Sequence, residues 1–374
     1  MHRHEPTDTP LNTCTLVWDG AGPPRVPAAM GTPRGDQLRG SPLDNLIELA
    51  GRVCYDSLGT KNSRNTDLYH DHINETGHHS THEHANFTAL VTVSGPNFGI
   101  LCESLLNRPG VWVEYGNDGD RAQWGRPSLR VTLNMRTVRD WVRAGVPDLN
   151  RSNGFASELG RALAGHATAL CPKACGDLVE YVGDGVTGID CRMDAPASDS
   201  EVWVSMHFEN VSRGLSHELV RHKYQTAVSQ RSTRFVAESE SQWVPHPLVL
   251  RRPALLAEFD DFAAVGGRLY DRLAHELETE LKADPATAGN ARKQARGAAR
   301  GVLGNALETQ LIFSASVAQW KWMIRTRTSM QADAEIRLAF NNVYALLSET
   351  FPARFAGWTT APCEDGLGYE ATGS

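Results

Sequence analysis

The sequence has no apolar run of about 18 residues, which argues against a membrane-spanning helix. Its start, MHRHEPTD, also lacks the apolar stretch of a signal peptide, so we expect a cytoplasmic protein. Cysteine is scarce, with seven residues that are odd in number and scattered, and the single close pair is Cys171 with Cys175. Because no second pair completes a zinc site there, we expect reduced thiols and no metal.

A basic surplus is also missing, since 37 Lys and Arg stand against 44 Asp and Glu, a net charge of −7. This balance argues against a dedicated nucleic-acid binder, although arginine clusters can still hold a small anion. A length of 374 residues with 41% hydrophobic residues suits a globular protein with a substantial core. We find no internal repeat in the sequence.

The first 40 residues are rich in Pro, Gly, Arg and Thr and show little apolar periodicity, so we expect a flexible arm at 1–40. We expect residues 41–374 to form the main domain. Its first helix is expected to start with Ser41 as N-cap and Pro42 in the first turn, and to end near Tyr55. The stretch 95–200, with Gly- and Asp-rich turns, has the character of a large insertion.

Hydrophobic patterning predicts further elements on both sides of this insertion. Strands are expected at His84–Val93, within LRVTLNM (129–135) and at Glu201–Phe208. Helices are expected at Arg136–Gly145, Ser212–His222, Ala254–Lys282 and Ala332–Thr350. The fold class is therefore predicted as α+β, with helices flanking a small antiparallel sheet. The apolar face of the 254–282 helix suits either the core of one subunit or a contact in an assembly.

The segment Ser216–Phe235 gathers basic and neutral hydrogen-bond donors in a short stretch. These are Arg221, His222, Lys223, Ser229, Gln230, Ser232 and Arg234. Guanidinium groups bind phosphate through paired N–H donors, and hydroxyl and amide groups between them add orientation. The segment therefore suits a phosphorylated ligand. On composition alone, a solvated basic helix end followed by a loop is the alternative.

The spacing in this segment resembles the signature of the flavin-dependent thymidylate synthases, the ThyX family. That signature is Arg-His-Arg, seven residues, Ser, and soon afterwards Arg and an aromatic residue. Here 221–223 read Arg-His-Lys, and eight residues separate them from Ser-Thr-Arg-Phe at 232–235. The third basic residue is therefore Lys, and one residue is extra.

Two N-terminal segments support the resemblance. Residues 77–88, GHHSTHEHANFT, are similar to the family block Gly-His-x-Ser/Thr-x-x-Glu-His, and 51–56, GRVCYD, resemble its Ala-Arg-Val-Ser-aromatic-Asp text. The resemblance implies that Ser80 and Glu83 contact the flavin and that His78 lies near it. Taken alone, the histidines permit a zinc site as an alternative, because neutral imidazole is a common ligand. They are His70, His72, His78, His79, His82 and His84.

A third segment lies near the C-terminus, where RGVL (300–303) and RTRTSMQADAEI (325–336) resemble family motifs. By this likeness Arg300 and Arg327 match arginines that hold the pyrimidine nucleotide. The family's Asn-x-Arg is replaced by Ser-Val-Ala at 316–318, and its flavin-facing His by Gln331. Because VTLNMRTVRDW (131–141) resembles the missing text, we hypothesise that Asn134 and Arg136 take over these flavin contacts.

Membership of this family implies transfer of a one-carbon unit from methylenetetrahydrofolate to C5 of UMP or dUMP. FAD would carry the hydride, NADPH would supply electrons, and the protein would be a homotetramer. Arg327 is the catalytic candidate, because a fixed guanidinium stabilises negative charge that develops on the uracil ring. Substrate binding is expected from Glu218, Arg221, Gln230, Ser232, Arg234, Arg300 and Arg327. Flavin binding is expected from His78, Ser80, Glu83, Arg221, His222, Lys223, Ser229, Gln230, Asn134, Arg136 and Gln331.

The length and the altered flavin residues also resemble the UMP and dUMP C5-methylase branch of polyoxin-type antibiotic pathways. Three alternatives stay open at this point. They are an ordinary dUMP-specific thymidylate synthase, a nucleotide- or flavin-binding protein without turnover, and a zinc-dependent hydrolase built on the histidines. No nucleic-acid or membrane partner is expected.

Overall fold

We analysed a computed structural model of the chain. It describes residues 11–59, 62–93, 101–102, 105, 110–115, 128–144, 155–182, 189–239 and 241–373. Within these ranges, no helix combines the length and the hydropathy needed to cross a bilayer.

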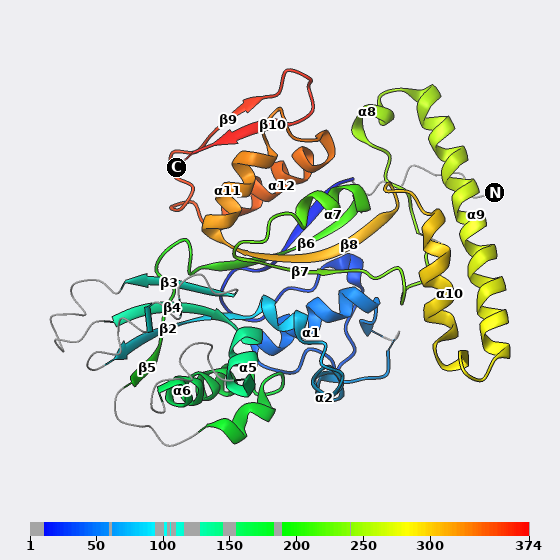
Figure 1. Cartoon of the computed structure of the whole chain (residues 1–374). Helices are drawn as coiled ribbons and strands as arrows, with labels where there is room; N and C mark the ends of the chain where they lie inside the picture. The colour runs from blue at the N-terminus through cyan, green and yellow to red at the C-terminus, as the bar shows by residue number, and fades with distance from the viewer. Residues whose placement is uncertain are drawn as a thin grey trace.

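One four-stranded antiparallel sheet lies at the centre of the chain fold (Figure 1). Its strands, in hydrogen-bonded order, are β1 (Thr13–Trp18), β6 (Trp203–Ser212), β8 (Glu308–Ser316) and β7 (Thr226–Gln230). Helices α11 (Val317–Arg327) and α12 (Ala334–Thr350) cover one face, together with the hairpin of β9 (Thr359–Pro362) and β10 (Tyr369–Thr372). The central strands β6 and β8 are buried almost throughout, so this sheet is a core element.

A second four-stranded antiparallel sheet is built mainly from the expected insertion. Its strands, in order, are β3 (Val111–Tyr115), β4 (Ser128–Asn134), β2 (Asn86–Val93) and β5 (Ile189–Asp194). Helices α5 (Met135–Ala144) and α6 (Phe155–Leu170) lie beside it (Figure 1), followed by the short helix η5 (Gly176–Tyr181). The sequence predicted one small sheet, whereas residues inside 95–200 form a second four-stranded sheet together with β2.

Helix α1 (Pro42–Tyr55) lies between the two sheets and contacts β7, β8 and the segment before β2. Ser41 and Asp44 form the capping box that fixes its start, as the Ser-Pro text predicted. The helix is buried on nearly every side, and its buried polar residues Glu48 and Arg52 form an ion pair at 2.6 Å. After α1 the chain forms α2 (Thr66–Thr76) and then the short helix η3 (His79–His84).

The remaining helices frame one side of the molecule. They are η1 (Ala28–Met30), α7 (Arg213–Leu219), α8 (Pro247–Leu250), α9 (Pro253–Ala283), η6 (Ala288–Asn290), α10 (Ala291–Ala299) and η7 (Arg300–Val302). Helices α9 and α10 pack against each other at the edge of the fold (Figure 1). Only Gly266 and Tyr270 of α9 are buried, whereas Phe262 and Val265 are more than half exposed.

Most predicted elements are confirmed within a few residues at each end. They are α1, β2, β4, α5, β6, α7, α9 and α12. Gly145, the expected last residue of α5, lies outside the described residues. The α+β class with antiparallel sheets is also confirmed.

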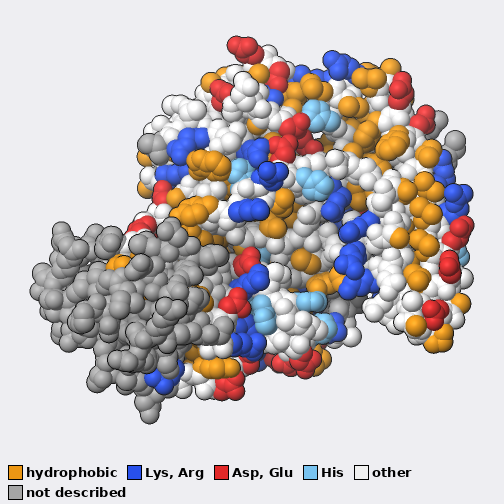
Figure 2. All heavy atoms as spheres, in the orientation of Figure 1, with side chains coloured by type: hydrophobic (Ala, Val, Ile, Leu, Met, Phe, Trp, Pro, Cys, Tyr) orange, Lys and Arg blue, Asp and Glu red, His pale blue; other side chains and the backbone are white. Residues whose placement is uncertain are grey.

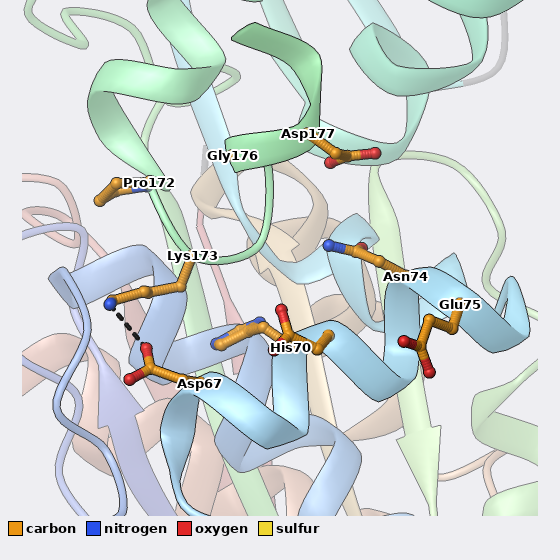
Figure 3. Close-up of a pocket in the computed structure, with 9 residues that line it drawn as sticks. Asp67, His70, Asn74, Glu75, Pro172, Lys173, Gly176 and Asp177 are labelled. Carbon is orange, nitrogen blue, oxygen red and sulfur yellow. Dashed lines mark ion pairs between the residues drawn. The ribbon is translucent and has the colours of Figure 1, made fainter.

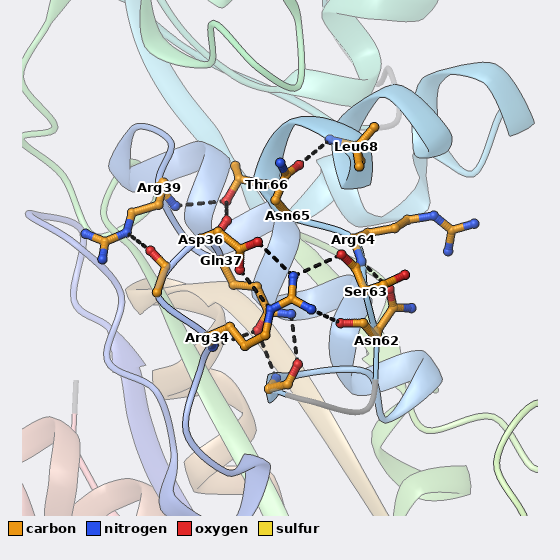
Figure 4. A network of polar contacts seen from close by, with 12 residues as sticks. Arg34, Asp36, Gln37, Arg39, Asn62, Ser63, Arg64, Asn65, Thr66 and Leu68 are labelled. Carbon is orange, nitrogen blue, oxygen red and sulfur yellow. Dashed lines mark hydrogen bonds and ion pairs between the residues drawn. The ribbon is translucent and has the colours of Figure 1, made fainter.

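The prediction of a flexible arm at 1–40 is wrong for the described part of that segment. Residues 13–18 form β1, which pairs with β6 and buries Leu16, Val17 and Trp18. Further along, Arg34 donates hydrogen bonds to the carbonyls of Asn62 and Ser63, at 2.8 and 2.9 Å. Figure 4 shows how residues 34–39 are joined to 62–68 by such contacts. Long-range pairing therefore orders a segment whose own composition gives no such signal; residues 1–10 lie outside the described residues.

Candidate functional site

The signature segment is divided between the two ends of β7. Arg221, His222 and Lys223 precede this strand, and Ser232 and Arg234 follow it. Five residues of extended chain span about 16 Å. The structure therefore separates the two halves of a motif that is compact in the sequence.

Arg327, at the end of α11, lies at the first of these ends. Its Nη1 pairs with Glu218 Oε2 at 2.6 Å, and its Nε donates to His222 Nε2 at 2.8 Å. Burial, followed by the neighbouring Arg327 charge, lowers the pKa of His222 to about 4. His222 is therefore neutral at pH 7 and can accept this hydrogen bond, so Arg327 is held by one acid and one neutral ring. Burial raises the pKa of Glu218.

The loop after β7 lies at the other end and is held by helix α1. Ser232 donates its backbone N–H to the Cys54 carbonyl at 3.0 Å. The rings of Tyr55 and Phe235 meet edge to face, 4.9 Å apart. The hydroxyl of Ser232 and the exposed Arg234 therefore project from a loop whose backbone is fixed.

Helix α10 and the turn after it bring further basic groups to this loop. Arg300 Nη1 donates to the hydroxyl of Thr233 at 3.4 Å, and Arg296 donates to the Phe235 carbonyl. Lys293 Nζ lies 5.0 Å from the centroid of the Phe235 ring. Figure 2 shows Lys and Arg side chains gathered in a column beside α10 on this face. The arrangement provides several donors for a phosphate group.

A cavity of about 290 Å³ opens next to the same loop. It is lined by Cys54, Tyr55, Ile73, Gly77, His78, His79, Ser80, Thr81 and Arg136. The Tyr55 hydroxyl and His78 Nδ1 are 3.1 Å apart, and Arg136 forms an ion pair with Glu83. The hydroxyl of Thr81 is buried and has no hydrogen-bond partner. Residues from three separated segments, which the sequence only suggested were related, therefore meet around one cavity.

A buried chain of hydrogen bonds anchors this cavity to the central sheet. His84 Nδ1 lies 2.7 Å from Ser314 Oγ, and its Nε2 lies 3.0 Å from Ser229 Oγ. Ser314 also meets the hydroxyl of Ser205 at 2.6 Å. Burial lowers the pKa of His84 to about 3, so the ring is neutral and can both donate and accept.

Several predicted flavin residues occupy positions that differ from the expectation. Ser229 is 3% exposed and faces His84, so it lies behind the cavity instead of at its surface. The amide of Gln230 donates to Ser216 and Thr309, which engages it inside the fold. Gln331 is exposed beyond the end of α11, on the Arg327 side.

Asn134 and Arg136 lie at the turn between β4 and α5, with Arg136 on the rim of the cavity. Asn134 Oδ1 accepts the backbone N–H of Thr137 at 2.8 Å and so caps α5. Its side chain is mostly buried, and Arg136 is exposed. The position of Arg136, close to Ser80 and Glu83, is therefore consistent with the hypothesis of a flavin contact. The side chain of Asn134 is already engaged as a helix cap.

The histidine cluster does not assemble into a metal site within the described part of the chain, where no group of three His, Cys, Asp or Glu residues has suitable geometry. A second and larger cavity, of about 460 Å³, lies between α2 and the segment 172–177 (Figure 3). Asp67, Asp71, Glu75 and Asp177 line it, with one Asp67–Lys173 ion pair at 2.6 Å. This acidic lining disfavours a phosphorylated ligand, so we place the candidate site at the smaller cavity.

Residues 201–353 match the family model described as thymidylate synthase complementing protein. This range holds β6, the signature segment and the arginines of α10, α11 and the turns beside them. Over this range the chain is similar to that family.

Curated flavin-dependent thymidylate synthases are also similar to part of the chain. The flavin-dependent thymidylate synthase of Mycolicibacterium vanbaalenii is 37% identical over 163 residues, and that of Mycolicibacterium gilvum is 36% identical over 163 residues. These alignments cover 44% of this chain and 64% of each relative. The chain thus matches less than two thirds of the length of these ThyX proteins.

A solved structure of ThyX from Helicobacter pylori, described with FAD and dUMP, is also similar. It is 18% identical and covers 45% of this chain and 74% of that protein, with a TM-score of 0.27. A second H. pylori ThyX structure, complexed with FAD and dUMP, has 19% identity and the same TM-score.

Some functional contacts carried no recognisable signal in the sequence. The ring contact of Tyr55 with Phe235 joins residues 180 positions apart, and nothing in the text around either residue indicates the other. The pairing of Glu218 with Arg327 was likewise not predicted from the sequence. Glu218 was expected to bind the substrate directly. An acid one helical turn before the basic motif is the one available hint, because buried or ordered arginines generally need an anionic partner.

Proposed function

We propose that the protein catalyses flavin-dependent C5 methylation of a pyrimidine nucleoside monophosphate. The observation that carries this proposal is the contiguity of the Ser232 loop with the cavity of the Gly77–Glu83 block, through the Ser232–Cys54 hydrogen bond and the Tyr55–Phe235 contact. A phosphate-binding loop and a second ligand pocket thus share one wall. The similarity to flavin-dependent thymidylate synthases supports the same reaction.

The cavity residues suit part of a flavin dinucleotide. Arg136 and Ser80 offer charged and neutral donors to phosphate oxygens, and the unpartnered hydroxyl of Thr81 offers a further bond. About 290 Å³ is at the lower bound of small-molecule sites, so the cavity would hold one end of FAD, with the rest outside it. When bound, FAD supplies hydride transfer. His78 and Glu83 would orient it from the same segment.

Nucleotide binding is assigned to the loop after β7. The phosphate would accept hydrogen bonds from Ser232, Arg234 and Arg300, which lie on fixed backbone beside α10. Ser232 has a binding role in this proposal, because no base that would activate it as a nucleophile is among its contacts. UMP is the preferred substrate in our proposal, with dUMP accepted, and methylenetetrahydrofolate and NADPH are the co-substrates, as in antibiotic-pathway C5-methylases.

Arg327 is proposed to stabilise the negative charge that develops on the uracil ring when C5 reacts. A guanidinium that is already oriented does this without reorganisation in the transition state. Glu218 and the neutral His222 hold Arg327 in one orientation, which is why we assign Glu218 a positioning role. His222 and Lys223 would face the flavin, from the same end of β7.

Because Arg327 and Ser232 lie at opposite ends of β7, one copy of the chain presents two half-sites. We therefore propose self-association, as a homotetramer, in which one copy supplies the Arg327 end and another supplies the Ser232 end. The exposed apolar residues of α9, such as Phe262 and Val265, offer surface for such contacts. A cytoplasmic location completes the proposal.

The test is tritium release from C5-labelled UMP and dUMP, measured separately, with FAD, NADPH and methylenetetrahydrofolate. Release that requires all three would support the methylase, and the ratio of the two rates would identify the preferred sugar. Binding of UMP by folded protein without any release would instead favour a nucleotide-binding protein without turnover.

A further inference from the structure

The two four-stranded sheets follow the same plan. In hydrogen-bonded order they are β1-β6-β8-β7 and β5-β2-β4-β3, and every neighbouring pair is antiparallel. The outer strands β1 and β5 have six residues each, and the opposite outer strands β7 and β3 have five. The likeness therefore extends to the length of each edge.

The registers of the two sheets also agree. The first residue of one central strand pairs with the last residue of the next, as Asn86 with Asn134 and as Trp203 with Ser316. Strands β3 and β7 each begin opposite the residue that precedes this last one. Strands β5 and β1 each end opposite the third residue of β2 and β6. The sheets differ inside the strands, because β1 and β6 each contain a register shift and the described strands of the second sheet contain none, so the agreement is at the ends that meet the caps.

The turns that leave the two sheets are equivalent in detail. Asn134 caps α5 and Ser316 caps α11, each accepting the backbone N–H three residues ahead. The next backbone N–H donates to the residue before the central strand, at 2.9 Å in one turn and 2.8 Å in the other. Both caps donate their own N–H to a residue with positive φ, Gly110 in one sheet and Gln225 in the other.

Chain order then identifies an exchange of strands. The first repeat contains β1, β2, β3, β4, α5 and α6, and the second contains β5, β6, β7, β8, α11 and α12. Helices α1 and α2 interrupt the first repeat, and α7 to α10 interrupt the second. Yet β1 pairs with β6 of the second repeat, and β5 pairs with β2 of the first. The expectation of no internal repeat is therefore wrong at the level of structure, because the repeats share hydrogen bonding and not residues.

The two equivalent turns differ in what faces them. Beside the β4–α5 turn lies the 290 Å³ cavity, with the unpartnered hydroxyl of Thr81 and with exposed Arg136, whose guanidinium pairs with Glu83 and Asp140. Beside the β8–α11 turn, the backbone N–H of Ala318 donates to the carbonyl of Asp199 at 2.9 Å. The Asp199 carboxylate pairs with Lys321 at 2.8 Å, on the same helix. The same carboxylate also pairs with Arg354, so two cations share it. The carbonyl of Asp199 thus covers the second turn by occupying the N–H of Ala318.

We infer that the chain is a fused pair of repeats with exchanged first strands, in which only the β4–α5 turn is kept as a binding site for the diphosphate of a dinucleotide. The equivalent β8–α11 turn is closed by Asp199. The ligand class rests on the proposed function, whereas the repeat does not. The chain therefore has one such site, although its architecture contains two equivalent places.

The test is calorimetric titration of the full chain with FAD and, separately, with inorganic pyrophosphate. We expect one FAD per chain and at least a tenfold loss of affinity in Arg136→Ala, since each tenfold corresponds to about 1.4 kcal/mol. Arg136→Lys should recover part of the affinity, because it restores the charge without the paired donors. Ala318→Arg places the same group at the closed turn and is the matched control, which should leave the stoichiometry at one.

Each outcome decides between the two proposals. One result would refute the flavin assignment and keep the single anion site. In it, one pyrophosphate binds per chain, its binding depends on Arg136, and FAD does not bind. Two ligands per chain, binding that Arg136→Ala leaves unchanged, or no binding of either ligand by folded protein would overturn the inference. Thermal melting of each variant checks that the fold is intact.

Discussion

The two sheets share a backbone plan but are buried to different degrees. In the sheet β1-β6-β8-β7 the central strands are enclosed between α1 on one face and α11 and α12 on the other. In the sheet β5-β2-β4-β3 the edge strand β5 leaves Arg192 and Met193 exposed. The enclosed sheet contains a buried polar chain through His84, and the other carries the open turn with Arg136. One plan thus serves as a core in one place and as a support for a ligand site in the other.

The largest expected effect on activity concerns α11, the helix that follows β8 of the enclosed sheet. Arg327→Ala should lower kcat by about 10²–10³-fold, because it removes an oriented donor to the developing charge. The assay is C5 tritium release at saturating nucleotide. Arg325→Ala, on the same helix, loses a hydrogen bond to the Gly373 carbonyl and a cation–π contact with Trp358, and kcat should stay within about threefold. Equal losses in both variants would remove Arg327 from the proposed role.

The buried polar chain should matter more for stability than the half-buried His166 of α6, the helix beside the other sheet. His84→Ala leaves a cavity and strands the hydroxyls of Ser314 and Ser229, so the free energy of unfolding should fall by about 2–4 kcal/mol. His166→Ala removes one bond, to the Cys191 carbonyl, and should cost about 1 kcal/mol. Urea denaturation measures both. A larger loss from His166→Ala would reverse the comparison.

Nucleotide affinity should depend on the loop beside α10. Arg300→Ala should raise KM for the nucleotide by about 10–100-fold, because a hydrogen bond to a charged group contributes about 1.5–3 kcal/mol. Arg292→Ala is the matched control, since Arg292 is exposed on α10 and faces Glu278 of α9. Initial rates at varied nucleotide concentration give both values. An unchanged KM in Arg300→Ala would exclude a phosphate contact there.

Acid should weaken the enclosed sheet through His84. Its folded-state pKa of about 3 lies below the ordinary value of about 6.5, so the unfolded chain binds the proton more readily between these values. The free energy of unfolding should therefore fall as pH is lowered, by about 2 kcal/mol from this residue between pH 7 and pH 5. In His84→Gln, which keeps a polar side chain, this part of the pH dependence should disappear. The same slope in both proteins would place the effect elsewhere.

The smallest effects concern the two equivalent caps. Asn134→Ala and Ser316→Ala each remove the acceptor for the first turn of a helix, which should cost about 1 kcal/mol. Ser316→Ala also removes a hydrogen bond to the buried Gln225 and should cost about 1 kcal/mol more. Thermal or urea unfolding of the two variants, side by side, tests the equivalence of the turns. Costs that differ by more than about 2 kcal/mol would show that the two caps are not alike.

Local signals in the sequence predicted most elements of the fold. The Ser-Pro-x-Asp start of α1 and the apolar patterns of β2, β4 and β6 depend on neighbouring residues, so a sequence window contains the information. Strand β1 was missed because its partner β6 lies about 190 residues away and its own flanks are polar. The repeat was missed because equivalent positions, such as Asn134 and Ser316, share a hydrogen-bonding role and not an identity.

The candidate site was predicted in its residue types but not in its arrangement. The basic signature and the Gly77 block were both recognisable, and the structure places the Gly77 block at the cavity and the Ser232 loop beside it. None of the described signature residues lines the cavity itself; the Ser232 loop lies next to it through Cys54 and Tyr55. Nothing in the signature indicated that β7 would hold Arg221 and Ser232 apart, or that Ser229 would turn toward His84. These outcomes depend on strand direction and burial, which become defined when the whole sheet is assembled.

The exchange of first strands also has a consequence for synthesis of the protein on the ribosome. Hydrogen bonds of β1 join Thr13 to Glu209, a separation of 196 residues. At about 5–20 residues per second, β1 waits on the order of 10–40 s for its partner to be made. During that time its buried side chains Leu16, Val17 and Trp18 have no sheet to cover them. A nascent chain in this interval is therefore a natural client for chaperones that bind short apolar strands.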